Sequence, residues 1–550
     1  MKTLIFPFAP VDMEERKDAD PLTTVTGGGV YLGSVVKALD RYGNYDRYYL
    51  IRNATSAQSV TDSSFSERVC FASLEDLPSF SSSDQVVLFT PDPAIHLLSP
   101  WRTSLNLPRA PITGIVHSMD NDLFFVLLMR HLLTGDMRDH DALICTSHSA
   151  KAVVEKALFR IGRRFERIAG RLPEFRPRLP VIPLGIWTSD FRRFARDAAR
   201  AAFNFAPESV VFLYLGRFST LAKADLAPLI LAFCLEVAPR FPKARLVLAG
   251  DDTDVSLAPD LRLLASELEH GDGVLILPDI STRSKHQLFA SADVFVSPSD
   301  NIQETFGLTL VEAMAAGLPV IASDWNGYKD IVVPGHTGFL VPTYMSRVHS
   351  WAPSSGPGML SSGLLAAQTV VDMEFWVRSA CDLAANPDLR QRMGVAGRSL
   401  ADRDYDWAVV IRNYEALWDE LFMEAGKVAK KTLPTEFAKI PFDGMGFQSV
   451  FDHYPTGMLA NQILEVNPAT ASLMSSPAIS HLLLQAPFSC REDIFAAVFK
   501  AAKRHTSSTA YELAASVSRE LELPESCVTT HLARLLKYGV LRLRQEGPSE

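Results

Sequence analysis

The chain has 550 residues, of which 47% are hydrophobic and 21% are charged, and its formal net charge is -9. This length predicts about two to four domains, and the composition is typical of a soluble globular protein rather than a disordered or fibrous one. The negative net charge of the whole chain does not indicate binding to nucleic acid. No apolar run is long enough to predict a membrane span, and the N-terminus, broken early by Pro7, does not predict a signal peptide.

The cysteines predict a reducing compartment. None of them belongs to a C-x-x-C pair, so the pattern favours free thiols and disfavours a structural zinc site. We therefore expect a cytoplasmic protein, with contact to a membrane surface left open. The six positions are Cys70, Cys145, Cys234, Cys381, Cys490 and Cys527.

The chain begins with a pattern of strand, glycine-rich loop and helix. The first predicted strand, Leu4–Phe6, is followed by a polar loop that ends in Gly27, Gly28 and Gly29, and a helical apolar period starts at Val30. This order is typical of a doubly wound sheet, and glycines in such a loop let the backbone approach a ligand. A flexible turn is nearly as good an interpretation of the local sequence. The spacing is not the G-x-G-x-x-G of a dinucleotide site.

His117 is the first candidate site residue. It directly follows a predicted strand, and open α/β sheets bind ligands beyond the carboxyl ends of their strands. A lone histidine is more often structural, and His148 after the next strand is interpreted as the neighbour of a helix cap. The strands predicted in this region are Arg47–Ile51, Val86–Thr90, Ile112–Val116 and Ala142–Thr146.

The alternation of strands and helices starts again after Ile186. Arg217 and Lys223 follow the first strand of this second set. An arginine fork and a lysine point charge at a strand end suit a diphosphate, whereas two surface cations are the plain alternative. Two such sets predict two α/β lobes. The strands of the second set are predicted at Val210–Leu215, Ala244–Ala249, Val274–Leu277, Asp293–Val296, Val320–Ala322 and Gly338–Val341.

The most informative stretch follows the strand that ends at Val296. A polar loop leads to a predicted helix from Leu308 to Ala316, closed by Gly317. The backbone N–H groups of Phe306, Gly307 and Leu308 have no partner inside this helix. The helix dipole also places partial positive charge there, so these groups can cradle a phosphate. We interpret Gly307 as removing a side chain where phosphates approach.

Two glutamates bracket the start of this helix. Glu304 lies in the loop and Glu312 lies inside the helix. Carboxylates accept hydrogen bonds from hydroxyls, and a nucleotide sugar carries phosphates between two sets of hydroxyls. Solvated glutamates on a core helix are the alternative interpretation of the bare pattern.

The order of strand, loop, Glu304, glycine, Glu312, Gly-x-Pro and new strand resembles the signature of the family-four retaining glycosyltransferases, with its E-x7-E spacing. The resemblance covers roughly the first three quarters of the chain. It implies the α/β GT-B fold, in which two Rossmann-like doubly wound lobes face a cleft. Residues 1–190 would form the acceptor-side lobe, residues 191–400 the nucleotide-sugar donor lobe, and residues 401–430 a crossover helix that packs back on the first lobe.

The resemblance implies retaining hexosyl transfer from a nucleotide-diphosphate sugar, with a UDP-sugar favoured, to an acceptor that the sequence does not name. Arg217 and Lys223 would hold the diphosphate together with the helix start, so that no metal and no other cofactor is expected. Lys223 lies one residue further from Arg217 than the family pattern. Glu304 would bind sugar hydroxyls near the reacting carbon, and Glu312 the ribose hydroxyls.

The same resemblance assigns the remaining site residues. His117 would lie near the transferred sugar. Gly28 and Gly29 would face the donor phosphates and the acceptor. The catalytic group would thus be Glu304, His117, Arg217 and Lys223, and the donor would contact Gly28, Gly29, Arg217, Lys223, Phe306, Gly307, Leu308 and Glu312.

The last quarter of the chain does not follow the family pattern. Residues 431–479 are interpreted as a linker or anchoring segment that includes Phe451–Thr456. Residues 480–550 predict a winged-helix-like module of two helices and a short wing. Its second helix contains His531, Arg534 and Lys537, as a DNA-reading helix does, but nearby glutamates interrupt any basic stripe.

Two other functions are weighed against the enzyme. A docking or dimerisation role suits the C-terminal module better than DNA binding. The main rival is a nucleic-acid-binding or partner-binding regulator built on a sugar-binding or inactive GT-B scaffold. Epimerisation or phosphorolysis on the same scaffold is a third possibility, but no motif for a pyridoxal phosphate lysine is present.

Overall fold

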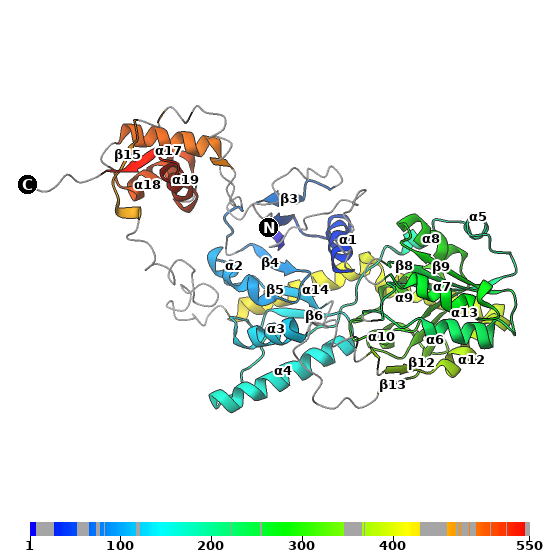
Figure 1. Cartoon of the computed structure of the whole chain (residues 1–550). Helices are drawn as coiled ribbons and strands as arrows, with labels where there is room; N and C mark the ends of the chain where they lie inside the picture. The colour runs from blue at the N-terminus through cyan, green and yellow to red at the C-terminus, as the bar shows by residue number, and fades with distance from the viewer. Residues whose placement is uncertain are drawn as a thin grey trace, which may run out of the picture. The chain divides into compact units, whose positions relative to one another are not determined.

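The computed structural model describes the chain except for residues 7–26, 52–64, 73–76, 82, 117–121, 221, 253–255, 346–362, 364–365, 368, 429–458, 469–470, 472–473, 475–482, 485–490, 506–507, 524 and 545–550. The chain divides into two compact units (Figure 1). The larger unit covers Met1–Tyr48, Phe65–Val69 and Phe80–Ala438 and contains both predicted lobes. The smaller unit contains Lys439–Glu550 and two short N-terminal segments.

The first lobe is built on a six-stranded sheet with the order β3-β2-β1-β4-β5-β6. The strands β1, β4, β5 and β6 pair in parallel and form where the sequence has short apolar runs. Because β1 lies beside β4, the sheet is doubly wound, as predicted. The elements are β1 (Lys2–Phe6), α1 (Gly27–Tyr42), β2 (Arg47–Ile51), β3 (Val69–Ala72), β4 (Gln85–Thr90), η2 (Ile95–Leu98), α2 (Ser99–Ser104), β5 (Ile112–Val116), α3 (Asp122–Thr134), β6 (Ala142–Cys145) and α4 (His148–Ala169).

The second lobe repeats this plan with the order β12-β11-β10-β7-β8-β9, and the paired strands are again parallel. Its core contains the inward faces of these strands and of the covering helices. The elements are η3 (Thr188–Arg192), α5 (Arg196–Ala202), β7 (Val210–Leu215), α6 (Ala227–Ala232), η4 (Phe233–Val237), β8 (Ala244–Gly250), α7 (Ala258–Ser266), η5 (Gly271–Gly273), β9 (Val274–Pro278), α8 (Thr282–Ser291), β10 (Val294–Ser297), α9 (Leu308–Ala316), β11 (Val320–Ser323), α10 (Tyr328–Ile331) and β12 (Gly338–Val341).

The segment after β12 forms a short antiparallel pair, β13 (Thr343–Met345) with β14 (Thr369–Val371). The helices α12 (Met373–Ala385), α13 (Pro387–Leu400) and η6 (Ala401–Tyr405) follow. Asp372 and Asn386 cap α12 and α13 through their side chains, which explains why each helix begins where it does.

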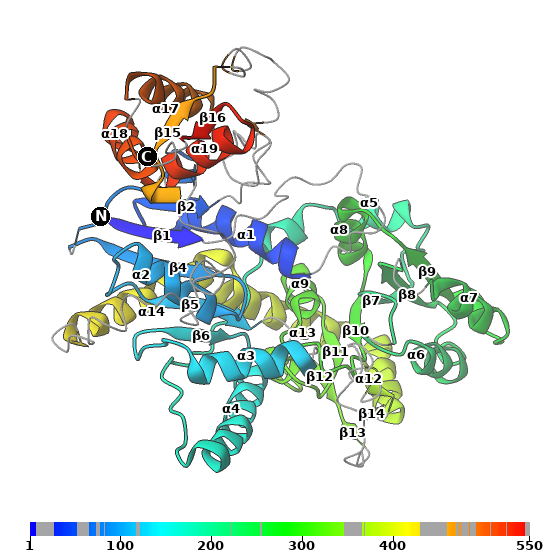
Figure 2. The same cartoon turned by 60° about the vertical axis from the view of Figure 1, so that its left-hand side comes forward.

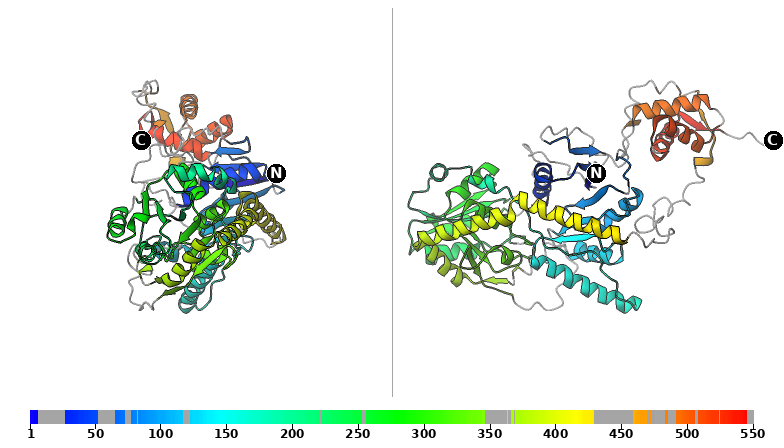
Figure 3. Two further views of the ribbon diagram at one scale, coloured as in Figure 1. Left: turned by 90° about the vertical axis from the view of Figure 1, so that its right-hand side faces the viewer. Right: turned by 180° about the vertical axis from the view of Figure 1, so that it is seen from behind.

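The last helix of the larger unit, α14 (Trp407–Val428), packs on the first lobe, as predicted (Figure 3). Trp418 is fully buried, and its Nε1 donates a hydrogen bond to Thr113 Oγ1 on β5 at 3.0 Å. Lys2 on β1 pairs with Asp419 at 2.8 Å. The two lobes are therefore linked by the chain connection near residue 186 and by this returning helix.

The described residues of the C-terminal region include three α-helices and a two-stranded antiparallel sheet around one apolar core (Figure 2). The helix α18 begins with a capping box in which Thr509 and Glu512 bond reciprocally. The strand β15 falls in the segment that the sequence assigned to a linker, yet Leu464 belongs to this core. The elements are η9 (Leu459–Asn461), β15 (Leu464–Val466), α17 (Glu492–Arg504), α18 (Ala510–Leu521), α19 (Glu525–Lys537) and β16 (Leu541–Leu543).

Two of the three α19 residues that a DNA-reading helix would use contact the unit itself, which agrees with the preference for a docking role over DNA binding. His531 is buried, its ring packs on Phe495, and Nε2 accepts a hydrogen bond from the Arg491 backbone N–H. Arg534 donates to the Leu483 carbonyl at 2.9 Å. These side chains therefore stabilise the core of the unit. The segment Phe451–Thr456 lies outside the described residues.

Candidate functional site

The predicted donor ligands meet at the ends of two adjacent strands of the second sheet. The strands β7 and β10 pair in parallel, although β8 and β9 lie between them in sequence. The chain runs outward through β8 and β9 and then returns to build β10, β11 and β12 on the other side. Open α/β sheets bind ligands at such a reversal of strand order, beyond the carboxyl ends of the strands. The loops of residues 216–226 and 298–307 follow these two ends.

The structure brings Arg217, Lys223 and Glu304 together at this point. Arg217 Nη2 donates to Gln303 Oε1 at 2.7 Å, and Lys223 Nζ forms an ion pair with Glu304 Oε2. Both side chains of the ion pair are only 14% exposed. Sequence reasoning treated Lys223 and Glu304 as separate ligands, but here they contact each other. Because an ammonium group has three N–H donors, Lys223 can hold Glu304 and still contact a second acceptor.

Tyr328 holds Glu304 from another side. Its hydroxyl donates to Glu304 Oε2 at 3.3 Å and lies 2.7 Å from Ser297 Oγ. Burial, followed by the charge of Glu304, raises the pKa of Tyr328 well above its ordinary value. The phenol therefore keeps its proton and serves as a fixed hydrogen-bond donor. No sequence pattern pointed to Tyr328, whereas Gln303 was open to prediction as a polar neighbour of Glu304.

The start of α9 offers unpaired backbone donors, as its position in the sequence indicated. Within the described part of the chain, the N–H groups of residues 306–308 donate no hydrogen bond. Gly307 has φ 124°, and a Cβ there would lie 2.7 Å from ring atoms of Tyr328. The backbone conformation and the Tyr328 ring thus require glycine. The interpretation that the absent side chain also makes room for phosphates stays a prediction.

Glu312 is a buried carboxylate with one partner. Lys285 on α8, which sequence reasoning missed, approaches Glu312 Oε1 to 2.7 Å. The Glu312 side chain is 7% exposed, and among the described residues its Oε2 atom has no hydrogen-bond partner. A buried acceptor without a partner costs stability, so this oxygen is suited to receive a ligand hydroxyl.

Asp300 is a second buried carboxyl group in the loop after β10. Its Oδ1 atom also has no partner among the residues described. Burial, followed by the charge of Asp225, raises the pKa of Asp300 to about 7. The group therefore changes protonation near neutral pH, within the same loop as Glu304.

The first lobe contacts this loop through the start of α4. Ser147 caps α4, and its Oγ also donates to the Thr305 carbonyl at 2.7 Å. The His148 backbone N–H donates to Asp330 at 2.6 Å. A hydroxyl of the first lobe thus holds the residue that follows Glu304, so the position of the loop depends on how the lobes meet.

Three predicted site residues are not placed at this point. His117 lies outside the described residues. Gly28 and Gly29 lie in the first turn of α1, which begins at Gly27, so the prediction of a loop at these glycines is wrong. The first N–H groups of a helix need no partner within it, so glycine is tolerated there.

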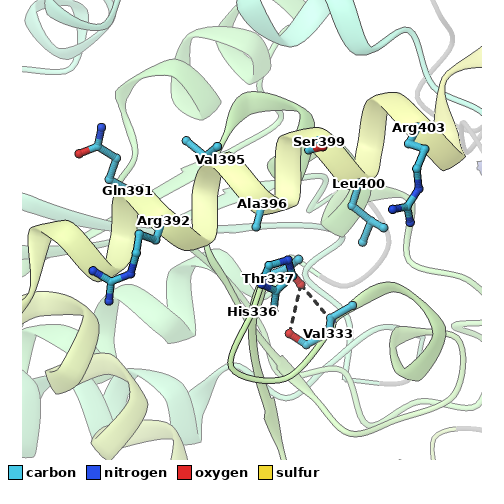
Figure 4. A pocket seen from close by; sticks show the side chains of 10 residues that line it. All are labelled: Val333, His336, Thr337, Gln391, Arg392, Val395, Ala396, Ser399, Leu400 and Arg403. Carbon is cyan, nitrogen blue, oxygen red and sulfur yellow. Dashed lines mark hydrogen bonds between the residues drawn. The ribbon is translucent and has the colours of Figure 1, made fainter.

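A cavity of about 640 Å³ is separate from these groups (Figure 4). It lies between α13 and the turn before β12. Arg403 at its edge is already paired with Asp404, and Arg392 and His336 are exposed. The chemistry described above does not use this cavity. The lining residues are Val333, His336, Thr337, Gln391, Arg392, Val395, Ala396, Ser399, Leu400 and Arg403.

Comparison with known proteins identifies the domain that contains the site. Residues 195–352 match the family described as glycosyl transferases group 1. Over these residues the second lobe is similar to a group 1 glycosyl transferase domain. The matched range includes Arg217, Lys223, Lys285, Glu304 and Glu312.

Curated relatives match part of the chain. A protein of Mycolicibacterium smegmatis named D-inositol 3-phosphate glycosyltransferase is 34% identical over 179 residues, which are 32% of this chain and 39% of the relative. A protein of Mycobacteroides abscessus with the same name is 29% identical over 197 residues, which are 36% of this chain and 42% of the relative. The chain thus spans about two fifths of the length of these relatives.

A solved structure resembles the larger part of the chain. The sucrose-phosphate synthase from Thermosynechococcus elongatus superposes with a TM-score of 0.51 at 19% identity, covering 77% of this chain and 99% of that one. At this identity the likeness shows the fold alone. The predicted fold of two doubly wound lobes, GT-B, is thereby confirmed.

Proposed function

We propose that the protein is a retaining, metal-independent glycosyltransferase that moves a hexose from a nucleotide-diphosphate sugar, with a UDP-sugar as the favoured donor. The observation that supports this most is the meeting of Arg217 and the Lys223–Glu304 pair at one reversal of strand order. Glu312, whose Oε2 atom has no partner among the described residues, lies on the helix that follows. Cations, backbone donors and hydroxyl acceptors are the groups that such a donor needs.

The donor would lie across the start of α9. Lys223, Arg217 and the N–H groups of residues 306–308 would neutralise and bind the diphosphate. Glu312, held by Lys285, would accept hydrogen bonds from the ribose hydroxyls. Glu304, held by Lys223 and Tyr328, would accept hydrogen bonds from the transferred sugar.

The transfer would take place on one face of the sugar. The bond from the anomeric carbon to the diphosphate oxygen breaks while the acceptor oxygen bonds to the same face of that carbon. The proton of the acceptor hydroxyl passes to the departing phosphate oxygen. The carbon gains positive character in between, which the Glu304 carboxylate and the phosphate stabilise. No side chain serves as a nucleophile.

The proposal does not name a single acceptor, but it ranks the acceptors to test. The curated relatives are named for an inositol 3-phosphate acceptor, so a cyclitol phosphate is the first acceptor to test. The aligned stretches are shorter than the two lobes together, and the acceptor would bind the first lobe. Other glycans, lipid-linked glycans, small molecules and peptides therefore belong in the same screen.

Thermal shift with a panel of nucleotide sugars would test the donor, followed by assays of donor hydrolysis and transfer. Arg217→Ala should lower kcat/KM, by an amount that corresponds to about 2–4 kcal/mol of lost transition-state stabilisation, because a charge next to the leaving phosphate is lost. Folding should remain intact. Arg392→Ala is the matched control, since Arg392 is exposed beside the separate cavity. Near-normal turnover of Arg217→Ala, or loss of activity in EDTA that magnesium or manganese restores, would contradict the proposal.

A further inference from the structure

The helix α4 has one face in the first lobe and one face in solvent. It has 22 residues and is therefore about 33 Å long. Its buried residues recur every fourth position, at Ala150, Val154, Leu158 and Gly162. Its C-terminal half extends beyond the sheet of the first lobe in the views of Figures 1 and 3.

The solvent face of α4 is strongly cationic. The helix contains six lysines and arginines and only two glutamates, a net charge of +4 in a chain whose net charge is -9. Each residue of an α-helix is rotated by about 100° from the one before it. On this geometry the five cations of the outer half lie within an arc of about 100° around the helix axis, opposite the buried face. We call them the α4 stripe, which consists of Lys156, Arg160, Arg163, Arg164 and Arg167.

The charges of the α4 stripe are largely uncompensated. Arg163 pairs with Glu166 in an exposed contact. Among the residues that the structure describes, Lys156, Arg160, Arg164 and Arg167 form no ion pair. An exposed stripe of guanidinium groups binds phosphate readily, because each group donates two parallel hydrogen bonds to it.

Large apolar side chains flank the stripe in solvent. Phe159 is 65% exposed on one side and Ile168 is 78% exposed on the other, and Leu172 follows just after the helix. A single exposed apolar residue needs no explanation, but two such residues that border a dense cationic stripe form a surface that is both cationic and apolar.

We propose that this face of α4 docks on the surface of an anionic lipid bilayer. The α4 stripe would contact lipid phosphates, and Phe159 and Ile168 would enter the boundary between headgroups and acyl chains. A nucleic acid would also attract the stripe, but the aliphatic Ile168 gains nothing on a phosphate backbone and cannot stack on a base. The apolar flanks therefore favour the bilayer. The contact is peripheral and holds the first lobe, opposite the proposed donor site, at the membrane.

The test uses the full chain and sedimentation with vesicles. Vesicles of phosphatidylcholine and phosphatidylglycerol should bind the protein with an affinity that falls as salt rises, and vesicles of phosphatidylcholine alone should not. Arg160→Gln/Arg164→Gln should bind roughly 30-fold more weakly, at about tenfold per 1.4 kcal/mol and about 1 kcal/mol per cation. Phe159→Ser/Ile168→Ser should weaken binding severalfold without changing its salt dependence.

Matched controls make the result specific. Arg392→Gln/Arg412→Gln removes the same charge from exposed positions elsewhere and should bind as the wild type. Unchanged thermal unfolding of all variants would exclude misfolding. Equal binding to neutral vesicles, equal losses in both arginine pairs, or binding of duplex DNA in place of vesicles would overturn the proposal. Donor hydrolysis does not enter the readout, so the outcome is independent of the proposed catalytic function.

Discussion

Replacing Lys285 by methionine should destabilise the second lobe more than replacing Glu312 by glutamine. Lys285 Nζ lies 2.7 Å from Glu312 Oε1, and the lysine side chain is 27% exposed while the glutamate is 7% exposed. Lys285→Met leaves a buried charge without its partner, which should cost about 3 kcal/mol. Glu312→Gln leaves an ammonium group that reaches water, so its cost should be about 1 kcal/mol.

The double variant separates the pair from its parts. Lys285→Met/Glu312→Gln removes both charges and should cost about 2 kcal/mol, less than the sum of the single variants, which gives a coupling of about 2 kcal/mol. Urea unfolding of the four proteins measures these values. The exposed pair Lys243–Glu208 provides a control cycle, in which the effects of the single variants should add because water screens the two charges. Additive costs at Lys285 and Glu312 would show that their contact does not stabilise the lobe.

Three further predictions follow from the same site. Glu304→Gln should lower kcat by about 10²-fold to 10³-fold, while Glu312→Gln should mainly raise the donor KM, because only Glu304 lies beside a carbon that gains charge. Equal and small effects of the two substitutions on kcat and KM in steady-state kinetics would contradict this. Asp300 holds its proton in the folded protein up to about pH 7, but in the unfolded chain it releases the proton near the ordinary aspartate pKa of 3.8. The free energy of unfolding should therefore fall as pH rises between these two values, by about 4 kcal/mol at most. Urea titrations at several pH values would measure this fall, and Asp300→Asn should abolish it. Ser147→Ala removes both the helix cap and the donor to Thr305, so it should lower kcat and cost about 1–2 kcal/mol of stability, whereas Ser147→Thr should behave as the wild type in both assays.

Local sequence was sufficient for most of the framework. Strands such as Val210–Leu215 and Gly338–Val341 form at the predicted bounds because a parallel strand buried on both faces needs an unbroken apolar run. The helix Leu308–Ala316 ends where predicted because Gly317 adopts a left-handed conformation, φ 84°, that other residues avoid. These features depend only on neighbours in the chain.

The arrangement within the site depended on contacts that the sequence does not display. Lys223 meets Glu304 across 81 positions, and Ser147 meets Thr305 across 158. No local pattern specifies such partners, because the sheet order and the lobe contact create them. The same limit applies at α19, where the sequence did not show that His531 is rotated into the core.

The return of α14 to the first lobe has a consequence for how the protein is made. Trp418 and Tyr414 stack together, and both rings pack on Phe89 of β4. A ribosome adds about 5–20 residues per second, so the sheet of the first lobe emerges tens of seconds before the helix that covers it. During this interval Phe89 and its neighbours are exposed on the nascent chain and invite chaperone binding or misassembly. A permuted chain that begins with α14 would close the first lobe early, and it should refold faster because its contacts are closer in sequence.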